Sequence, residues 1–259
     1  MQQRLLSLTA LAVSLFSGSG AAQCARETLE AATEKLLAAQ TAGKPDTLGA
    51  LANVAYLEQF KTADMTKGIL ATPLALDFNR SLHDTVQCAT YTEMVSAKGA
   101  HPYVVGTQMH FTPDGAALTN VSTLVTDQGD WLFNATGTLY WASREAWDVI
   151  PEDQRDSRET IQAAADAYAD IFNDKSVTVP WGSPCARLEG GAYTGSGSAS
   201  DRCDVGIPNG VALTNRRYVI DETLGAVDVF IDFASLPDSH EFRVEKGKIR
   251  YVHTITVMG

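Results

Sequence analysis

The chain has 259 residues, of which 45% are hydrophobic and 20% charged, and its formal net charge is −11. This composition is typical of a globular protein and excludes a largely disordered chain. The acidic balance makes nucleic-acid phosphates and anionic membrane surfaces poor partners, so we expect binding to neither.

The first 22 residues have the three parts of a secretory signal peptide. A short basic start, MQQR, precedes the apolar run LLSLTALAVSLF, and the small residues SGSGAA follow. We expect cleavage after Ala22 and a secreted, extracellular mature protein. Lipid attachment at Cys24 is not expected, because Gln23 stands where a bacterial lipoprotein signal needs Gly or Ala.

Three short matches indicate an internal repeat. They pair RETLEAA at 26–32 with RETIQAA at 158–164, AYLE at 55–58 with ARLE at 186–189, and VSTL at 121–124 with VHTI at 252–255. The matches keep the same order at offsets of 132, 131 and 131 residues, which favours a duplicated architecture. We therefore expect a first half at 23–128, a Trp-rich connecting segment at 129–157 and a second half at 158–259.

Each half begins with a predicted helix and ends with antiparallel strands. The apolar residues Leu29, Ala32, Leu36 and Ala39 recur at helical spacing, and a PDG turn separates the strand-like segments 101–112 and 117–126. The connecting segment contains three tryptophans and is too apolar for a free linker, so we expect it to pack across both halves.

The second half repeats this plan. Ser157 can cap a helix along which Ile161, Ala164, Tyr168 and Ile171 recur. Four strands follow at 216–222, 226–233, 240–245 and 248–257, where residues alternate in polarity or are β-branched and aromatic. The predicted class is therefore α+β, with a helix layered on an antiparallel sheet in each half.

This order of elements resembles the SnoaL-like, or nuclear transport factor 2-like, cone fold. The segment VPWGSPCARLEGGAYTG at 179–195 lies where SnoaL-like proteins carry a proline-containing approach to a strand that ends in Glu-Asn-Gly, here Glu189-Gly190-Gly191. The C-terminal stretch, with NRRYVIDETLGAVDVF and PDSHEFRVEKGKIRYVHTIT, also resembles an uncharacterised family of secreted fungal proteins. The resemblance implies secretion and two tandem SnoaL-like halves packed as a pseudo-dimer, and it names no substrate.

Four cysteines in an exported chain favour disulfides over a metal or redox site. They allow three connectivities, of which we favour Cys185–Cys203, because these two bracket a Gly/Ser-rich loop, with Cys24–Cys88 as the remaining pair. Three sequons, Asn79, Asn120 and Asn134, predict surface glycosylation if the host is a eukaryote.

The last two strands carry the candidate site. With Lys246-Gly247 as the central turn residues, His240 faces His253 on the more apolar side of the hairpin, beside Tyr251. Two neutral imidazoles at this place could act as general acid and base. The alternative is a structural pair buried in the core.

We therefore predict a secreted, cofactor-independent lyase, dehydratase or isomerase that acts on a small polar molecule, possibly derived from a sugar. His253 would be the base and His240 its acid or orienting partner, while Tyr251, Glu189 and Arg217 would hold the substrate. Trp181 could stack on the ligand, although core packing is the more frequent role. The alternative function is a secreted, non-catalytic protein that binds a small ligand in the same pocket.

Other chemistries have less support. Glu189 could equally form an exposed ion pair with Arg187, and Arg217 a plain ion pair with Asp221. No HxxxH or HxH spacing supplies a third ligand to the histidines, so no metal is predicted. The sequence contains neither GxSxG nor GxxxxGK[ST], which disfavours a serine hydrolase and a phosphate-binding loop.

Overall fold

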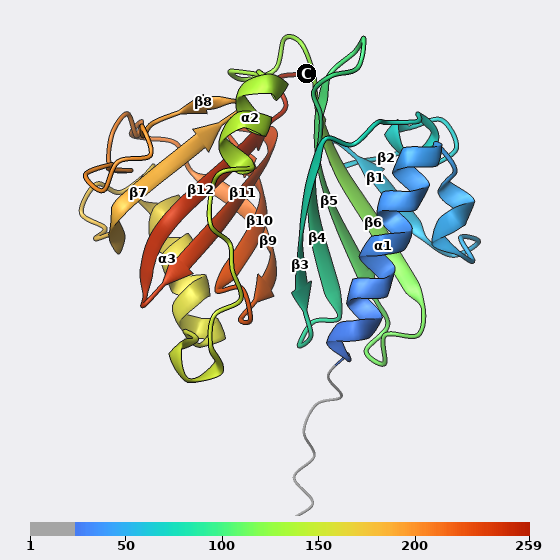
Figure 1. The fold of residues 1–259 in the computed structure, drawn as a ribbon, viewed down its shortest axis with the longest axis horizontal. Helices are drawn as coiled ribbons and strands as arrows, with labels where there is room; N and C mark the ends of the chain where they lie inside the picture. Colours follow the sequence, from blue (N-terminus) through green and yellow to red (C-terminus); the bar gives the residue numbers. More distant parts are fainter. Residues whose placement is uncertain (1–23) are drawn as a thin grey trace, which may run out of the picture.

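The computed structural model describes residues 24–259, so the expected cleavage point after Ala22 lies outside the described residues. Within them the chain forms two six-stranded mixed sheets, ordered β2-β1-β6-β5-β4-β3 and β8-β7-β12-β11-β10-β9. The class is α+β, as predicted. Figure 1 shows the two sheets standing face to face, with one long helix on the outer side of each.

The first sheet combines one parallel and four antiparallel pairings. The parallel pairing joins β1 to β6, and β6 continues into the meander β5-β4-β3. The strands are β1 (Ala55–Glu58), β2 (Lys61–Thr62), β3 (Phe78–Asp84), β4 (Ala89–Ser96), β5 (Tyr103–Phe111) and β6 (Leu118–Thr126).

The second sheet repeats this topology strand for strand. Its strands are β7 (Trp181–Glu189), β8 (Ala192–Tyr193), β9 (Leu213–Asp221), β10 (Ala226–Phe233), β11 (Leu236–Glu245) and β12 (Lys248–Thr256). Tyr56 of β1 pairs with Val121 of β6, and Arg187 of β7 pairs with Val252 of β12. The sequence matches AYLE/ARLE and VSTL/VHTI therefore mark equivalent strands, and the predicted duplication is confirmed.

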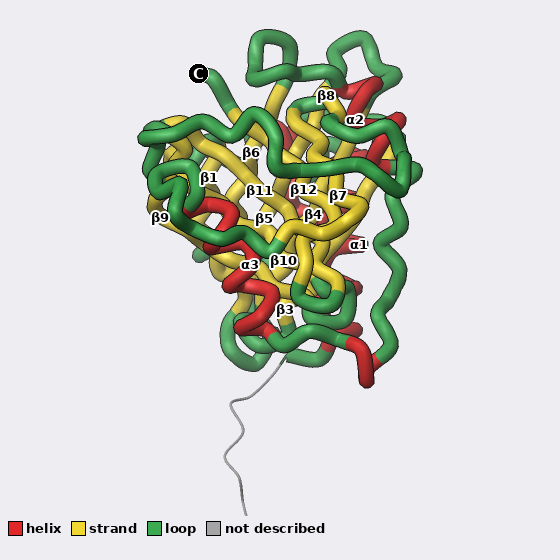
Figure 2. Tube along the Cα trace, turned by 90° about the vertical axis from the view of Figure 1, so that its left-hand side faces the viewer, coloured by secondary structure: helices red, strands yellow, loops and turns green. Residues whose placement is uncertain are grey.

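Helices α1 (Arg26–Ala42) and α3 (Arg158–Asp170) cover the outer faces of the sheets. Leu36 packs with the first sheet, and Tyr168 packs with the second. A third apolar cluster, which includes Leu82 and Phe230, lies between the two sheets. The layers are thus helix, sheet, sheet, helix (Figure 1), and Figure 2 views the stack face-on from the side of the second sheet. Ser157 caps α3 through a hydrogen bond from the Thr160 amide, as expected.

The connecting segment packs against both halves, as its apolar composition predicts. Its helix α2 (Ala135–Ala142) lies beside strands of both sheets. The ring of Trp141 stacks on that of Tyr193 in β8, and Trp147 joins the apolar cluster between the sheets. Three short 3₁₀ turns complete the described chain, at Pro45–Leu48, Ile69–Ala71 and Glu152–Gln154.

Reciprocal ion pairs join the two halves. Arg26, the first residue of α1, donates two hydrogen bonds of 2.9 Å to Asp221 of the second sheet. Arg158, the first residue of α3, donates bonds of 2.8 and 2.7 Å to Asp84 of the first sheet. Both carboxylates are fully buried. The sequence match RETLEAA/RETIQAA therefore begins at the residue that holds each helix to the opposite half.

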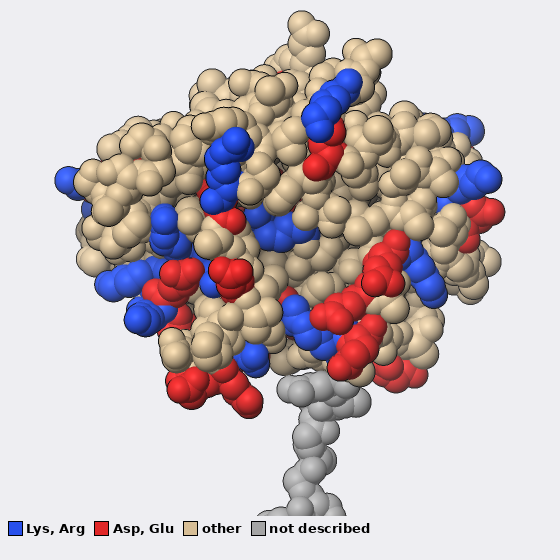
Figure 3. Space-filling view, viewed as in Figure 1, with Lys and Arg blue, Asp and Glu red and all other residues tan. Residues whose placement is uncertain are grey.

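The surface in Figure 3 carries Lys and Arg interspersed with Asp and Glu. The net charge of −11 is consequently not concentrated in a single acidic patch on this face. Among the described residues, none of the helices has both the length and the apolar character needed to cross a bilayer.

Candidate functional site

The β11–β12 hairpin contains a bulge that the turn sequence does not reveal. Next to the turn, Val244 pairs with Ile249, as predicted. The register then shifts by one residue, so that Arg243 pairs with Tyr251. Arg250 is the extra residue: it lies in β12 between the partners of Val244 and Arg243 and has no partner of its own in β11, as in a β-bulge.

This shift separates the two histidines. Side chains alternate across a strand, so a one-residue shift turns every later side chain to the opposite face. His253 pairs with Glu241, and His240 pairs with Thr254. The prediction that the imidazoles meet is therefore wrong: His240 faces α3, where it contacts the ring of Tyr168, and His253 faces the first sheet.

His240 lines a cavity of about 230 Å³ between the second sheet and α3. Six residues of three adjacent strands form what we call its polar floor: Arg187 and Glu189 of β7, Asp238 and His240 of β11, and Thr254 and Thr256 of β12. Thr254 pairs with Glu189 on one side and with His240 on the other. The polar groups consequently form a continuous row across the sheet.

Asp238 and His240 are the chemically most suggestive pair of this floor. They lie two residues apart on β11 and so share a face. His240 Nδ1 is 3.1 Å from Asp238 Oδ2, without the alignment of a hydrogen bond, and neither atom has another partner among the described residues. The other carboxylate oxygen accepts a hydrogen bond of 2.9 Å from the hydroxyl of Thr256. Thr256 thereby orients Asp238 beside the imidazole.

Arg187 and Glu189 share the same face of β7, as their spacing predicts. Arg187 Nε lies 3.0 Å from Glu189 Oε1, and Arg187 Nη2 donates a hydrogen bond of 2.5 Å to the carbonyl of Val205. The arginine is buried, whereas the Glu189 side chain keeps 23% of its exposure. The cavity thus contains a cation, two carboxylates and an imidazole within one small floor.

The walls of the cavity are mainly apolar. Tyr168 of α3 and Phe172 in the turn after it lie on one side, and their ring centroids are 5.3 and 6.4 Å from that of His240. Burial raises the pKa of the Tyr168 hydroxyl, which keeps it protonated. Trp131 and Met258 line the cavity and are 47% and 46% exposed, so they mark its mouth.

A disulfide holds the loop that forms the remaining wall. Cys185 of β7 is bonded to Cys203, eighteen residues later, and the loop carries Gly206 and Pro208 into the cavity lining. Val205, two residues beyond Cys203, supplies the carbonyl that Arg187 contacts. The disulfide therefore positions the arginine as well as the loop.

The equivalent floor of the first half keeps Glu58 and Thr123 at the places of Glu189 and Thr254 but lacks the Asp–His–Arg group. Because the registers correspond, Thr107 stands at the place of His240, Val105 at that of Asp238 and Tyr56 at that of Arg187. Met94 and Met109 fill this region as part of the apolar core. That the second half is the functional one stays a prediction.

His253 belongs to a buried charged cluster between the sheets, formed with Arg80, Glu93, Glu145 and Glu241. Its Nδ1 lies 3.1 Å from Glu93 Oε2, and its Nε2 lies 2.6 Å from Glu145 Oε2. Burial opposes a charged imidazole, but Glu145 and Glu93 outweigh it and raise the pKa of His253 to about 10. The raised pKa favours an imidazolium at neutral pH, with Nε2 donating to Glu145, while Nδ1 lies between Glu93 and the Nη2 of Arg80, which is 3.0 Å away.

Arg80 fills the centre of this cluster. Its Nη2 lies 2.8 Å from Glu93 Oε2 and 2.5 Å from Glu241 Oε2, and its guanidinium stacks 3.7 Å above the ring of Trp147. Glu93, Glu241 and His253 could by geometry hold a metal ion. Because Arg80 already places a positive charge between the two carboxylates, the structure gives this cluster its own internal cation.

The other predicted site residues lie apart from the cavity. Tyr251 faces the first sheet with His253 and stacks on Trp147 at 5.9 Å. Trp181 packs edge-on against Tyr168 at 5.7 Å in the core of the second half. The guanidinium of Arg217 in β9 stacks 3.9 Å from the ring of Phe60. The expected ion pair of Arg217 with Asp221 is not formed, because Asp221 is paired with Arg26 instead. Of the residues predicted to line the site, His240 and Glu189 share the cavity.

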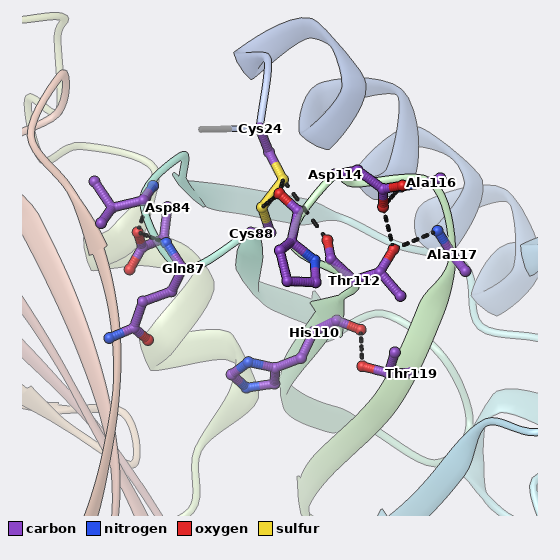
Figure 4. Close-up of a disulfide and its surroundings, with 12 residues drawn as sticks. Cys24, Asp84, Gln87, Cys88, His110, Thr112, Asp114, Ala116, Ala117 and Thr119 are labelled. Atoms are coloured by element: carbon purple, nitrogen blue, oxygen red, sulfur yellow. Dashed lines mark hydrogen bonds between the residues drawn. A yellow bond between two sulfur atoms is a disulfide. The ribbon is translucent and has the colours of Figure 1, made fainter. Parts of the chain in front are cut away.

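Both predicted disulfides are present. Figure 4 shows Cys24, at the start of α1, bonded to Cys88, and the side chain of His110 directed away from the disulfide. Of the three sequons, Asn79 and Asn134 are exposed and Asn120 is partly buried. Asn134 also caps α2 by accepting a hydrogen bond from the Gly137 amide. Glycosylation stays a prediction at all three.

Sequence reasoning missed the residues that complete both groups. Asp238 precedes His240 by two positions in PDSHEF, and that spacing on a strand was a usable signal for a shared face. Arg80, Glu93 and Glu145 gave no such signal, because they reach His253 from another sheet and from the connecting segment.

The family model of a domain of unknown function, DUF8021, matches residues 154–256, which is less than half of the chain. The matched stretch spans the second half from just before α3 to the end of β12 and contains the whole polar floor. The sequence motifs predict an uncharacterised family from about residue 125 to the C-terminus, and the match covers most of that stretch. A search of curated proteins finds no match to the chain.

Proposed function

We propose that the protein is a secreted, cofactor-independent lyase, dehydratase or isomerase whose site is the cavity of the second half. The observation that carries this proposal is the Asp238–His240 pair, 3.1 Å apart on the floor of a cavity that Arg187 also reaches. A histidine with an adjacent carboxylate is a suitable general base near neutral pH. Two disulfides fit an oxidising, extracellular compartment.

The roles differ from those expected from the hairpin pattern. His240 would be the base and Asp238 its orienting partner, while His253 would have a structural role in the inter-sheet cluster. If the imidazole turns so that Nδ1 donates to Asp238, Nε2 is the nitrogen that can take a proton from the substrate. Arg187 would stabilise the negative charge that develops on a neighbouring carbonyl oxygen. The proton would return to another carbon in an isomerase or leave with a hydroxyl group as water in a dehydratase.

The cavity suggests the shape of the substrate. Its floor is polar, whereas Tyr168, Phe172, Phe233 and Leu236 make the walls apolar. A molecule with a polar, reactive end and an apolar body would satisfy both surfaces. We therefore favour a small carbonyl or hydroxy acid, or its lactone, with a hydrocarbon or aromatic part.

We also infer that both halves are SnoaL-like. The shared plan of a helix followed by a mixed sheet with the same strand order supports this assignment. Fold alone does not determine activity, so the reaction is argued from the floor residues and not from the fold.

Ligand binding without turnover is the second candidate function. His240 is only 3% exposed and contacts the rings of Tyr168 and Phe242, which favours a role in shaping the cavity. A binding protein would use the same floor to recognise a polar ligand end but would not exchange its protons.

Deuterium incorporation tests the two candidates without knowledge of the natural substrate. Carbonyl acids, hydroxy acids and lactones would be incubated with the protein in D₂O, and exchange of their C–H bonds would be followed by NMR. We expect exchange by the wild type and a loss of roughly 100-fold or more in His240→Gln, the range typical of general-base catalysis.

The matched control is His101→Gln, because the His101 side chain is 59% exposed and lies outside the cavity. Exchange that persists in His240→Gln would refute the catalytic role. Compounds that shift the cavity resonances without any exchange would support the binding function instead.

A further inference from the structure

The internal repeat gives Arg80 a structural counterpart in the second half. Asp84 pairs with Ala89 at the end of β3, as Asp221 pairs with Ala226 at the end of β9. Counting back four residues from each aspartate places Arg80 and Arg217 at equivalent positions. Each arginine therefore projects from the edge strand of its own sheet toward the other sheet.

The partners of the two arginines have diverged. Arg80 is paired across β3–β4 with Glu93, whereas Arg217 is paired across β9–β10 with Phe230. The facing sheet offers Glu241 to Arg80 but Gln108 at the equivalent position for Arg217. Both carboxylates that neutralise Arg80 are thus replaced by uncharged side chains around Arg217.

Arg217 is consequently a half-buried cation to which the described residues offer no hydrogen-bond acceptor. Its Nε and Nη2 are both buried and have no hydrogen-bond partner among residues 24–259. The guanidinium stacks on Phe60 at 3.9 Å, which orients it without neutralising it. Burial lowers the pKa of Arg217, and the charges of Asp232 and Asp228 oppose this shift without cancelling it.

A cavity of about 510 Å³ opens at this position. Arg217 lines it from β9, and Gln108, His110 and Ser122 line it from the facing sheet. Ser122 Oγ is a second buried polar atom without a partner among the described residues. At the equivalent place around Arg80, Glu145 and Trp147 of the connecting segment fill the space. The space around Arg80 is therefore filled and its charge neutralised, whereas the equivalent space around Arg217 is open.

The charged neighbours of this cavity do not supply the missing acceptor. Arg216 is held by Asp166 and Asp170 of α3. Asp232 is hydrogen-bonded by Asn215. Asp228 is occupied by other donors, because its two oxygens accept hydrogen bonds of 2.6 Å from Gln108 and Ser239.

We propose that this second cavity, which we call the Arg217 pocket, binds the oxyanion of a small organic acid. The oxygens would accept hydrogen bonds from the Arg217 guanidinium and from the Ser122 hydroxyl, while Leu57 contacts the apolar part. Carboxylates, sulfates and phosphates share this chemistry. The site is separate from the polar floor around His240, and the proposal does not depend on catalysis there.

Thermal unfolding and calorimetry with four sodium salts test the proposal: benzoate, acetate, sulfate and inorganic phosphate, each compared with chloride at equal ionic strength. We expect at least one of them to raise the Tm of the wild type and to bind with measurable heat. Arg217→Met should weaken that binding by roughly ten- to hundredfold, because a hydrogen bond to a charged group is lost. Ser122→Ala should weaken it less.

The equivalent substitution Arg80→Met is the matched control. Without added salts it should lower the Tm strongly, because Glu93 and Glu241 lose their shared cation. Arg217→Met should leave the Tm unchanged or raise it, because it removes an uncompensated charge. Equal losses of Tm in the two variants would overturn the proposal, and so would the absence of an Arg217-dependent response to all four salts.

Discussion

The inter-sheet cluster predicts a specific dependence of stability on pH. The pKa of His253 is about 10 in the folded protein, compared with an ordinary value of 6.5. Between these values the folded chain retains a proton that the unfolded chain has released. The stabilisation that His253 contributes is therefore fully present below pH 6.5 and is lost as the pH rises through 10.

The size of this effect follows from the shift. One retained proton makes the free energy of unfolding fall by about 1.4 kcal/mol per pH unit between the two pKa values. The full shift corresponds to about 5 kcal/mol, and raising the pH from about 7.5 to 9 should remove about 2 kcal/mol. Buried tyrosines such as Tyr56, whose ordinary pKa is 10.0, add a slope only at higher pH.

Urea unfolding at pH 6, 7.5 and 9, with the disulfides intact, measures this slope. The wild type should lose stability steadily, whereas His253→Gln should be less stable at pH 6 and nearly independent of pH above 7. His101→Gln, which removes an exposed histidine, should keep the slope of the wild type. A wild-type midpoint that stays constant from pH 6 to 9 would show that His253 is neutral in the fold and that the charge assignment is wrong.

Three further outcomes concern the fold. Asp84→Asn should lower the free energy of unfolding by about 3–5 kcal/mol in urea, because Arg158 then has a buried charge without its carboxylate. Replacing Cys185 and Cys203 with serine should cost roughly 3 kcal/mol for a loop of this length, and calorimetry should show the lower Tm. Leu36→Ala should cost about 2–5 kcal/mol with an unchanged dependence on pH, since it removes apolar side chain from the first core.

Much of the architecture could be predicted because it depends on local patterns. Helical spacing located α1 and α3, alternation located the strands of the second half, and the repeat placed AYLE and ARLE on equivalent strands. Cysteine spacing identified both disulfides. Each of these patterns can be read from neighbouring residues or by comparing the sequences of the two halves.

The site was less predictable because one extra residue in β12 reversed the face to which His253 points. Lys246-Gly247 correctly marked the turn, but the bulge at Arg250 moved His253 to the other face of the sheet. Such a bulge depends on how β12 pairs with its neighbours, and the hairpin sequence does not specify it. The inter-sheet cluster depends further on Arg80 and Glu93, whose distance from His253 in the chain hides their proximity.

The duplication explains why the two halves could become unequal. In a symmetric dimer a substitution alters both copies of an interface, so a new charge meets its own symmetry mate. Here Glu93 and Phe230 occupy equivalent positions, and each could change alone. The buried ion pairs of Arg26 and Arg158 hold the halves together independently of these positions. The interface could therefore remain intact while the two halves diverged. The charge of Arg80 is neutralised, the Arg217 pocket is open, and the floor of the second half, unlike its counterpart, carries Asp238 and His240.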